Sequence, residues 1–239
     1  AEVEHKDIQG AFYHIKYAIK GSSETLEVAT TRPETLFGDT AVAVNPEDER
    51  YKHLIGKKAI IPLCNREVPI IGDEHVDLEK GTGCLKVTPG HDFNDFEIGK
   101  RHNLPIINIL NKDGTLNEQG MEFLGLPAKE ARKKVAKKLE ELELLIDTKS
   151  HMHPVGHGER SGVVIEPMIS KQWFVNVKDM SARAVAAVEK DETKFFPKEW
   201  ENTYYSWLRD PKDWCISRQL WWGHQIPVFY CEDCGHQWA

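Results

Sequence analysis

Short apolar runs bounded by turn-forming residues constrain the fold of this chain more than any other feature of its sequence. Alternate residues of 11–20 are apolar, which is typical of a strand with one buried face, and Gly21 begins a turn into a second strand over 25–30. A small helix is expected from Pro46 to about Leu54. Further strands are expected at residues 41–44, 58–62, 68–71, 85–87 and 105–110. This pattern predicts an α+β fold, a compact β-barrel-like domain with peripheral helices, and argues against a doubly wound sheet.

Polar groups converge between an expected strand and an expected helix in the middle of the chain. Lys86 and Thr88 are two residues apart, so their side chains point the same way from a strand. Asp92 is expected to cap a helix, which places it and Asp95 beside the positive end of the helix dipole, where both carboxylates can stay ionised. With the imidazole of His91, these groups could face one small space. The alternative is a surface turn with an N-cap aspartate and a solvated lysine.

A second polar run, Thr30–Thr35, follows the second expected strand at the point where Pro33 forbids the strand to continue. Thr30, Thr31 and Arg32 could contact an anion or a ribose from this strand end. The run could equally be a capped turn.

The segment from Pro127 to about Leu145 carries the clearest helical pattern. Its apolar residues recur at spacings of four and three and form one stripe: Ala131, Val135, Leu139, Leu142 and Leu145. The opposite face carries these cations: Lys129, Arg132, Lys133, Lys134, Lys137 and Lys138. This face could receive a phosphate backbone, or it is a solvated surface that neighbouring glutamates partly balance.

The character of the sequence changes after Ser150. We expect residues 1–150 to form one domain and residues 151–239 to form a mixed strand and helix connecting segment. Within that segment, an extended stretch is expected over 163–177 and a helix over 178–190.

Candidate metal ligands occur only in this connecting segment. His151, His153 and His157 lie among Gly and Pro without the spacing of a helical metal site, so a loop is expected there. Cys231 and Cys234 resemble half of a zinc knuckle, but a closed zinc site needs about four ligands. We therefore expect an unfilled or cut-off site and no bound metal.

Composition excludes several classes of protein. No run of about 18 apolar residues is present, which argues against a membrane span, and the N-terminus lacks the pattern of a signal peptide. The 5 cysteines are too few and scattered for a disulfide framework, and the net charge of -7 argues against a chain coated with positive charge for nucleic acid. A cytoplasmic monomer is expected.

Four strings of residues together resemble the valyl-tRNA synthetases, which are class I aminoacyl-tRNA synthetases. They are Thr30–Tyr51, which contains Thr-Arg-Pro-Glu-Thr-Leu-Phe-Gly-Asp, then Gly81–Asp95, Ser170–Val175 and Asp213–Pro227, which contains Arg-Gln-Leu-Trp-Trp-Gly-His. Neither ATP-binding motif of the class, of the His-Ile-Gly-His or the Lys-Met-Ser-Lys-Ser type, is present. The resemblance therefore implies the editing insertion of such an enzyme and the segment that leads back to its catalytic core, without adenylation activity of its own.

The resemblance also implies a reaction and a set of roles. The reaction is hydrolysis of threonine wrongly esterified to the terminal adenosine of tRNA(Val). Asp95 matches the aspartate that binds the α-ammonium group of the amino acid. Lys86, Thr88 and Asp92 match positions that line the side-chain pocket. The remaining positions face the nucleotide: Thr30, Thr31 and Arg32 lie towards the adenosine and the ester, and His91 is assigned a contact to water or the ribose.

Cofactors and partners follow from the same resemblance. We expect no cofactor for the editing reaction, with ATP, and zinc if any, confined to the full-length parent. The expected partners are the 3′ end of tRNA(Val) carrying threonine and the rest of the synthetase. At Lys80 the resemblance predicts an aromatic or apolar contact to the adenine, which a lysine does not supply. Two alternatives stay open: a tRNA-docking module without hydrolytic activity, and a zinc-ribbon segment around Cys231 and Cys234.

Overall fold

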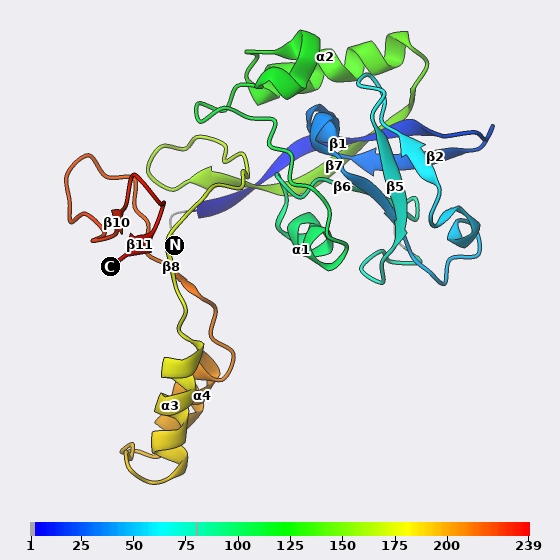
Figure 1. Ribbon diagram of the computed structural model, residues 1–239. Coiled ribbons are helices and arrows are strands. Elements are labelled where there is room, and N and C mark those ends of the chain that lie inside the picture. Colours follow the sequence, from blue (N-terminus) through cyan, green and yellow to red (C-terminus); the bar gives the residue numbers. More distant parts are fainter. Residues whose placement is uncertain (1–2, 80) are drawn as a thin grey trace. The chain divides into compact units, whose positions relative to one another are not determined.

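The computed structural model describes residues 3–79 and 81–239, so the expectation for Lys80 lies outside the described residues. The chain divides into two units, one ending at Ile169 and the other spanning Ser170–Ala239 (Figure 1). This division falls after the predicted boundary at residue 150, because strand β7 (Leu145–Gly158) runs through that position. The functional meaning of the two predicted domains stays a prediction.

A curled, 7-stranded sheet forms the first unit (Figure 1). Its order is β2-β1-β4-β5-β3-β6, and β7 pairs with β1. The strands are β1 (Val3–Ile19), β2 (Thr25–Thr30), β3 (Ala41–Val44), β4 (Lys58–Ile60), β5 (Glu67–Gly72), β6 (Cys84–Val87) and β7. The β3–β5 pair is parallel, and the other described pairs are antiparallel. With helices packed around this sheet, the predicted α+β fold is confirmed.

The predicted hairpin at the start of the chain is confirmed and determines where the Thr30 run lies. β1 and β2 pair antiparallel, with Tyr13 opposite Thr30. The inner face of β1 is buried, and Ile15 and Tyr17 are both 0% exposed. Burial of one such large apolar side chain contributes about 1.5–3 kcal/mol. The end of β2 is therefore held in place by a well-packed strand.

Two predicted helices are also confirmed. α1 (Phe93–Arg101) begins after Asp92, whose side chain accepts hydrogen bonds from the backbone of its first turn. α2 (Ala128–Glu141) buries Ala131, Val135 and Leu139 of the predicted stripe against the core of the first unit, but it ends before Leu142, which is 50% exposed, and Leu145 begins β7. Two short 3-10 helices, η1 (Pro33–Gly38) and η3 (Glu118–Phe123), pack beside α2.

The helix predicted from Pro46 to Leu54 is wrong, since only a short 3-10 turn, η2 (Lys52–Leu54), forms there. The side chain of Asn45 accepts a hydrogen bond from the backbone N–H of Glu47 (2.9 Å), and that of Asp48 accepts one from the N–H of Arg50 (3.0 Å). Such local bonds compete with those of a helix and favour consecutive turns.

The strand predicted at residues 105–110 is wrong as well, because that segment is irregular apart from an isolated bridge between Leu110 and Leu116. The backbone N–H of Ile109 donates to the ring of His91 (2.9 Å) instead of to a neighbouring strand. The segment therefore supports the histidine and does not extend the sheet.

The loop predicted around His151, His153 and His157 is a third error, since all three lie in β7. This strand pairs with β1 from Val3 as far as Ile15. Both faces of this two-stranded ribbon are half-buried or exposed over much of its length, so β7 lacks the apolar alternation by which a strand is recognised.

The second unit contains the predicted helix over 178–190, observed as α3 (Lys178–Glu189), which packs against α4 (Trp200–Leu208). The stretch predicted as extended over 163–177 ends in the short strand β8 (Phe174–Val175), which pairs with β9 (Trp214–Cys215). Cys231 and Cys234 stand at a turn between β10 (Phe229–Tyr230) and β11 (Gln237–Trp238). Among the described residues, no three possible ligands gather around a common point, and no helix is long and apolar enough to cross a bilayer.

Candidate functional site

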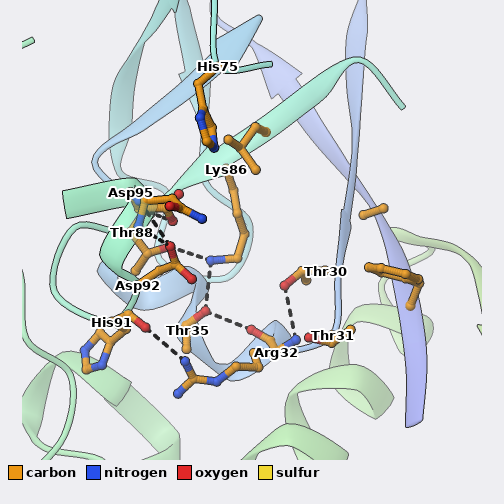
Figure 2. Close-up of a pocket in the computed structure, with 14 residues that line it drawn as sticks. Thr30, Thr31, Arg32, Thr35, His75, Lys86, Thr88, His91, Asp92 and Asp95 are labelled. Carbon is orange, nitrogen blue, oxygen red and sulfur yellow. Dashed lines mark hydrogen bonds between the residues drawn. The ribbon is translucent and has the colours of Figure 1, made fainter. Parts of the chain in front are cut away.

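One cavity of about 260 Å³ in the first unit is lined by every residue that the sequence predicts for the site. It lies between the end of β2, strand β6 and the start of α1 (Figure 2). The predicted residues around it are Thr30, Thr31, Arg32, Lys86, Thr88, His91, Asp92 and Asp95. Two segments that are distant in the sequence, residues 30–32 and residues 86–95, thus converge as expected, while the role of each residue stays a prediction.

The ammonium group of Lys86 is held below the cavity surface rather than exposed in it. The residue is 7% exposed, and its Nζ donates to the hydroxyls of Thr35 (2.8 Å) and Thr88 (Figure 2). It also donates to the carboxylate of Asp39 (2.9 Å). These three acceptors use all three N–H donors of the ammonium group. The lysine therefore organises its neighbours and has no donor left for a ligand.

Asp39 supports this arrangement from beneath. Its side chain is 0% exposed, and Oδ1 accepts a hydrogen bond from the hydroxyl of Thr88 (2.7 Å) as well as from Lys86. Oδ2 accepts from the hydroxyl of Tyr17 (2.7 Å), and burial, reinforced by this carboxylate, raises the pKa of that phenol well above its ordinary value. The orientation of the Thr88 hydroxyl is thereby determined: its proton points to Asp39.

Hydroxyl groups at the cavity wall consequently offer lone pairs rather than protons. Thr88 donates to Asp39 and accepts from Lys86, and Thr35 donates to the carbonyl of Arg32 (2.9 Å) and accepts from Lys86. A hydroxyl oxygen has two lone pairs, so each keeps one for a further donor. This part of the wall is complementary to a ligand group that can donate a hydrogen bond.

The two aspartates at the start of α1 lie in different environments. Asp92 is exposed, and its Oδ1 caps the helix by accepting from the N–H groups of Asn94 (2.8 Å) and Asp95 (3.1 Å). Asp95 is 7% exposed, and its Oδ2 accepts from the backbone N–H of Thr88 (2.8 Å). Burial raises the pKa of Asp95 to about 6, and nearby Lys86 offsets only part of this rise. At pH 7 this carboxylate is still mostly ionised, whereas below about pH 6 its burial favours the protonated form.

Arg32 closes another side of the cavity and joins two segments. Its Nη1 donates to the backbone carbonyl of His91 (3.1 Å), and its Nη2 donates to the carboxylate of Glu166 (2.6 Å). The backbone N–H of Arg32 donates to the hydroxyl of Thr30 (3.1 Å), which forms the capped turn that the sequence allowed. Arg32 thus both lines the cavity and pins the chain around it.

His91 is fully engaged by the backbone. Its Nδ1 lies 2.9 Å from the carbonyl of Pro167, and its Nε2 accepts from the N–H of Ile109 (2.9 Å). This pairing requires the neutral tautomer with the proton on Nδ1. Burial lowers the pKa of this imidazole to about 4, which agrees with the neutral form. In this structure His91 shapes the cavity, and its contact with water or a ribose stays a prediction.

Behind the cavity, a buried ion pair ties α2 to η1. The side chain of Glu34 is 0% exposed and receives two hydrogen bonds from the guanidinium group of Arg132, at 2.7 and 3.0 Å. The two residues are 98 positions apart. One of the six cations predicted on the outer face of α2 is therefore turned inward and has a structural role.

Sequence reasoning missed several contributors to this site. Thr35 and Asp39 belong to the same motif as Arg32, but only the η1 turn shows that both face Lys86. Phe12 lines the cavity from β1, and Glu166, near the end of the first unit, accepts a hydrogen bond from Arg32. The shared motif was the available signal for Thr35 and Asp39, whereas the sequence carries no local signal for Phe12 and Glu166.

Comparison with known proteins places the chain in a class. The family of class I tRNA synthetases (I, L, M and V) matches residues 1–238. The chain belongs to this family. Within it, the chain is similar to valine–tRNA ligases, as its motifs predict.

The similarity to individual relatives covers almost the whole chain. It is 55% identical over 235 residues to the enzyme of Clostridium perfringens, which covers 98% of this chain and 27% of that protein. The enzymes of Bacillus subtilis and Thermotoga maritima are 54% and 53% identical over the same shares of each chain. The chain thus spans about a quarter of the length of these relatives. Among solved structures, it is similar to the LeuRS of the ternary complex of Agrobacterium radiobacter K84 agnB2 LeuRS-tRNA-LeuAMS, with a TM-score of 0.46 and 19% identity over 97% of this chain and 24% of that one.

Proposed function

We propose that this chain is the editing part of a valine–tRNA ligase and hydrolyses threonyl-tRNA(Val). The need for such an activity is physical. Threonine and valine are nearly isosteric, and the apolar pocket of valine-specific synthetases is known to reject threonine by only about 100-fold. A second site that favours threonine must remove the errors. The cavity beside Asp95 supports this assignment because it is small, polar and offers both a carboxylate and hydrogen-bond acceptors.

The amino group of the substrate supplies the first recognition step. An aminoacyl ester carries a free α-ammonium group, and Asp95 is a buried carboxylate at the cavity wall. An ion pair between them is a charge-assisted hydrogen bond in a poorly solvated place, where such bonds are strong. The approaching cation also lowers the pKa of Asp95 and so favours its ionised form.

The side-chain hydroxyl supplies the second step. In our proposal it donates to the free lone pair of Thr88 or Thr35, whose own protons are committed elsewhere. Valine has a methyl group there and cannot donate this hydrogen bond, whose loss costs about 0.5–1.5 kcal/mol. Lys86 and Asp39 then act as positioning residues that determine which way the hydroxyls point.

The hydrolysis itself is assigned to water. Burial raises the pKa of the Cys84 thiol to about 12, so it stays protonated, and both ring nitrogens of His91 are engaged. Water attacks the ester carbonyl, the bond to the ribose oxygen breaks, and a proton passes to that oxygen, releasing threonine and free tRNA. Positioning of the ester by Thr30, Thr31 and Arg32 supplies the rate enhancement. The step uses no cofactor, and ATP chemistry belongs to other parts of the parent, for which we propose a cytoplasmic location.

The alternative, a docking module without hydrolytic activity, is separated by one variant. Asp95→Ala is expected to abolish hydrolysis of threonyl-tRNA(Val) while the chain still binds the tRNA. Glu97→Ala removes an exposed carboxylate from the same helix and is the matched control. Hydrolysis by the Asp95→Ala chain at the wild-type rate would refute the assignment of Asp95, and a wild-type chain that binds tRNA without hydrolysing it would support the docking module.

A further inference from the structure

A row of aromatic rings leads away from the cavity along the ribbon formed by β1 and β7. Phe12 lines the cavity, and its ring lies 4.4 Å from that of His151 between centroids. The ring of His151 stacks on that of His153, with centroids 5.6 Å apart and planes inclined by only 5°. We call Phe12, His151 and His153 the ring ladder. It is continuous from the cavity wall outward.

The ladder is a regular feature of the ribbon. His151 and His153 alternate along β7 and so share one face of it, together with Lys149, which stands opposite Phe12. Gly10 stands opposite His151, and a Cβ atom at that position would lie 2.4 Å from Cε1 of His153. Glycine weakens a strand interior, so its presence suits a place where the ring must lie close to the backbone.

We propose that the ring ladder stacks the unpaired nucleotides that precede the terminal adenosine of the tRNA. This inference rests on the proposed function, which places that adenosine at the cavity. The preceding nucleotides must then cross the rim of the cavity, where Phe12 stands. The rings of the ladder are only half-buried, so their surfaces are accessible.

The chemistry of the ladder fits single-stranded RNA. Bases stack on aromatic side chains with little dependence on sequence, because every base has a flat ring surface. Lys149 adds an exposed cation on the same face, its ion pair with Asp147 being long at 3.8 Å and open to solvent. Proteins that bind single-stranded nucleic acid usually combine aromatic rings, which stack on the bases, with cations that contact the phosphate backbone.

The test measures RNA binding directly, independently of hydrolysis. The probe is a labelled single-stranded RNA oligonucleotide ending in CCA, and the readout is its Kd by fluorescence anisotropy. The double variant His151→Ala with His153→Ala is expected to weaken binding at least 10-fold. Met152→Ala is the matched control, because it changes an exposed side chain on the other face of β7. This side chain should not contact a base, so Kd should stay within 2-fold of the wild-type value. An unchanged Kd in the double variant overturns the proposal.

Conservative replacements separate stacking from other effects. His151→Phe with His153→Phe keeps the rings and should restore binding to within about 3-fold of wild type, whereas lysines at both positions supply cations without rings and should not. Restoration by lysine but not by phenylalanine would overturn the stacking proposal in favour of a purely electrostatic one.

A second readout distinguishes failure of the ladder from failure of the proposed function. Threonyl-tRNA(Val) and the small ester threonyl-adenosine are compared as substrates. The alanine double variant should raise KM for the tRNA substrate about 10-fold and leave threonyl-adenosine unaffected. If the wild-type chain hydrolyses neither substrate, the proposed function is wrong. The measured Kd for RNA still shows whether the ring ladder binds single-stranded RNA. An equal loss on both substrates would contradict the proposal, because His151 and His153 do not line the cavity that the small ester occupies.

Discussion

The ammonium group of Lys86 lies 2.9 Å from Oδ1 of Asp39, and the two side chains are 8% and 0% exposed. Two opposite charges are thus removed from water and satisfied by each other and by neighbouring hydroxyls. Such a pair contributes little net stability compared with apolar residues, but the loss of one partner leaves the other charge buried and unpaired. In this site the pair determines the direction of the hydroxyls that face the cavity.

Breaking this pair should therefore destabilise the first unit strongly. Asp39→Ala and Lys86→Met are each expected to cost about 3–5 kcal/mol, and the double variant much less than their sum. All 7 tryptophans lie in the unit Ser170–Ala239, so their fluorescence does not report on this effect. Amide hydrogen exchange of β6 measures the loss of stability instead. Additive losses in the double variant would show that the pair is not coupled.

The ionisation of Asp95 should make stability depend on pH. Its pKa is about 6 in the folded chain and about 4 when unfolded, so the folded state binds more protons between these values. Its contribution to the free energy of unfolding is present below pH 4 and falls by up to about 3 kcal/mol as pH rises to 6. His91, with a pKa lowered to about 4, acts in the opposite direction over the same range. The measurement is therefore the difference between wild type and Asp95→Asn.

In that comparison, Asp95→Asn should gain stability relative to wild type as pH increases from 4 to 6. The same group should affect catalysis, because an ammonium group binds the ionised carboxylate. KM for threonyl esters is expected to fall as pH rises through about 6 in wild type, and the inflection should be absent in Asp95→Asn. A pH-independent difference in stability between the two proteins would contradict the buried position of Asp95.

Two changes at Asp92 separate its capping role from a role in the cavity. Asp92→Ala removes the acceptor for two N–H groups and should cost about 1 kcal/mol, whereas Asp92→Asn keeps an acceptor and should cost only a few tenths. Exchange of the α1 amides measures this. A higher KM for threonyl esters in Asp92→Asn, at unchanged stability, would assign the carboxylate to the substrate.

The cations of α2 divide into two groups with different expected effects. Arg132→Met removes both hydrogen bonds from Arg132 to Glu34, leaves this buried carboxylate only the longer contact with Arg32 (3.6 Å), and should destabilise the first unit by about 3–5 kcal/mol. Lys133 and Lys134 are exposed, and their replacement by alanine should change stability by less than about 0.5 kcal/mol. If α2 binds tRNA, the two lysine variants should reduce the salt dependence of binding by about one charge each. An unchanged salt dependence of tRNA binding would indicate that these lysines form a solvated surface of α2 and do not contact the tRNA.

Local patterns were enough to predict that Lys86, Thr88, Asp92 and Asp95 could face one small space. Lys86 and Thr88 follow from the period of a strand, and Asp92 and Asp95 from helix capping, since neighbours along the chain decide these positions. The contacts that orient them join residues such as Lys86 and Asp39, 47 positions apart, which no local pattern encodes. β7 was missed for a related reason, because its strand conformation depends on hydrogen bonds to β1 and not on an apolar face that its own sequence would reveal.

The central claim is that this cavity releases threonine but not valine from tRNA(Val). The most direct measurement is the rate at which this chain deacylates threonyl-tRNA(Val), with valyl-tRNA(Val) as the matched substrate. We expect threonine to be released at least 10-fold faster, because valine cannot donate the additional hydrogen bond that Thr35 or Thr88 can accept. Equal release of both amino acids, or release of neither by a folded chain that binds the tRNA, would contradict the account.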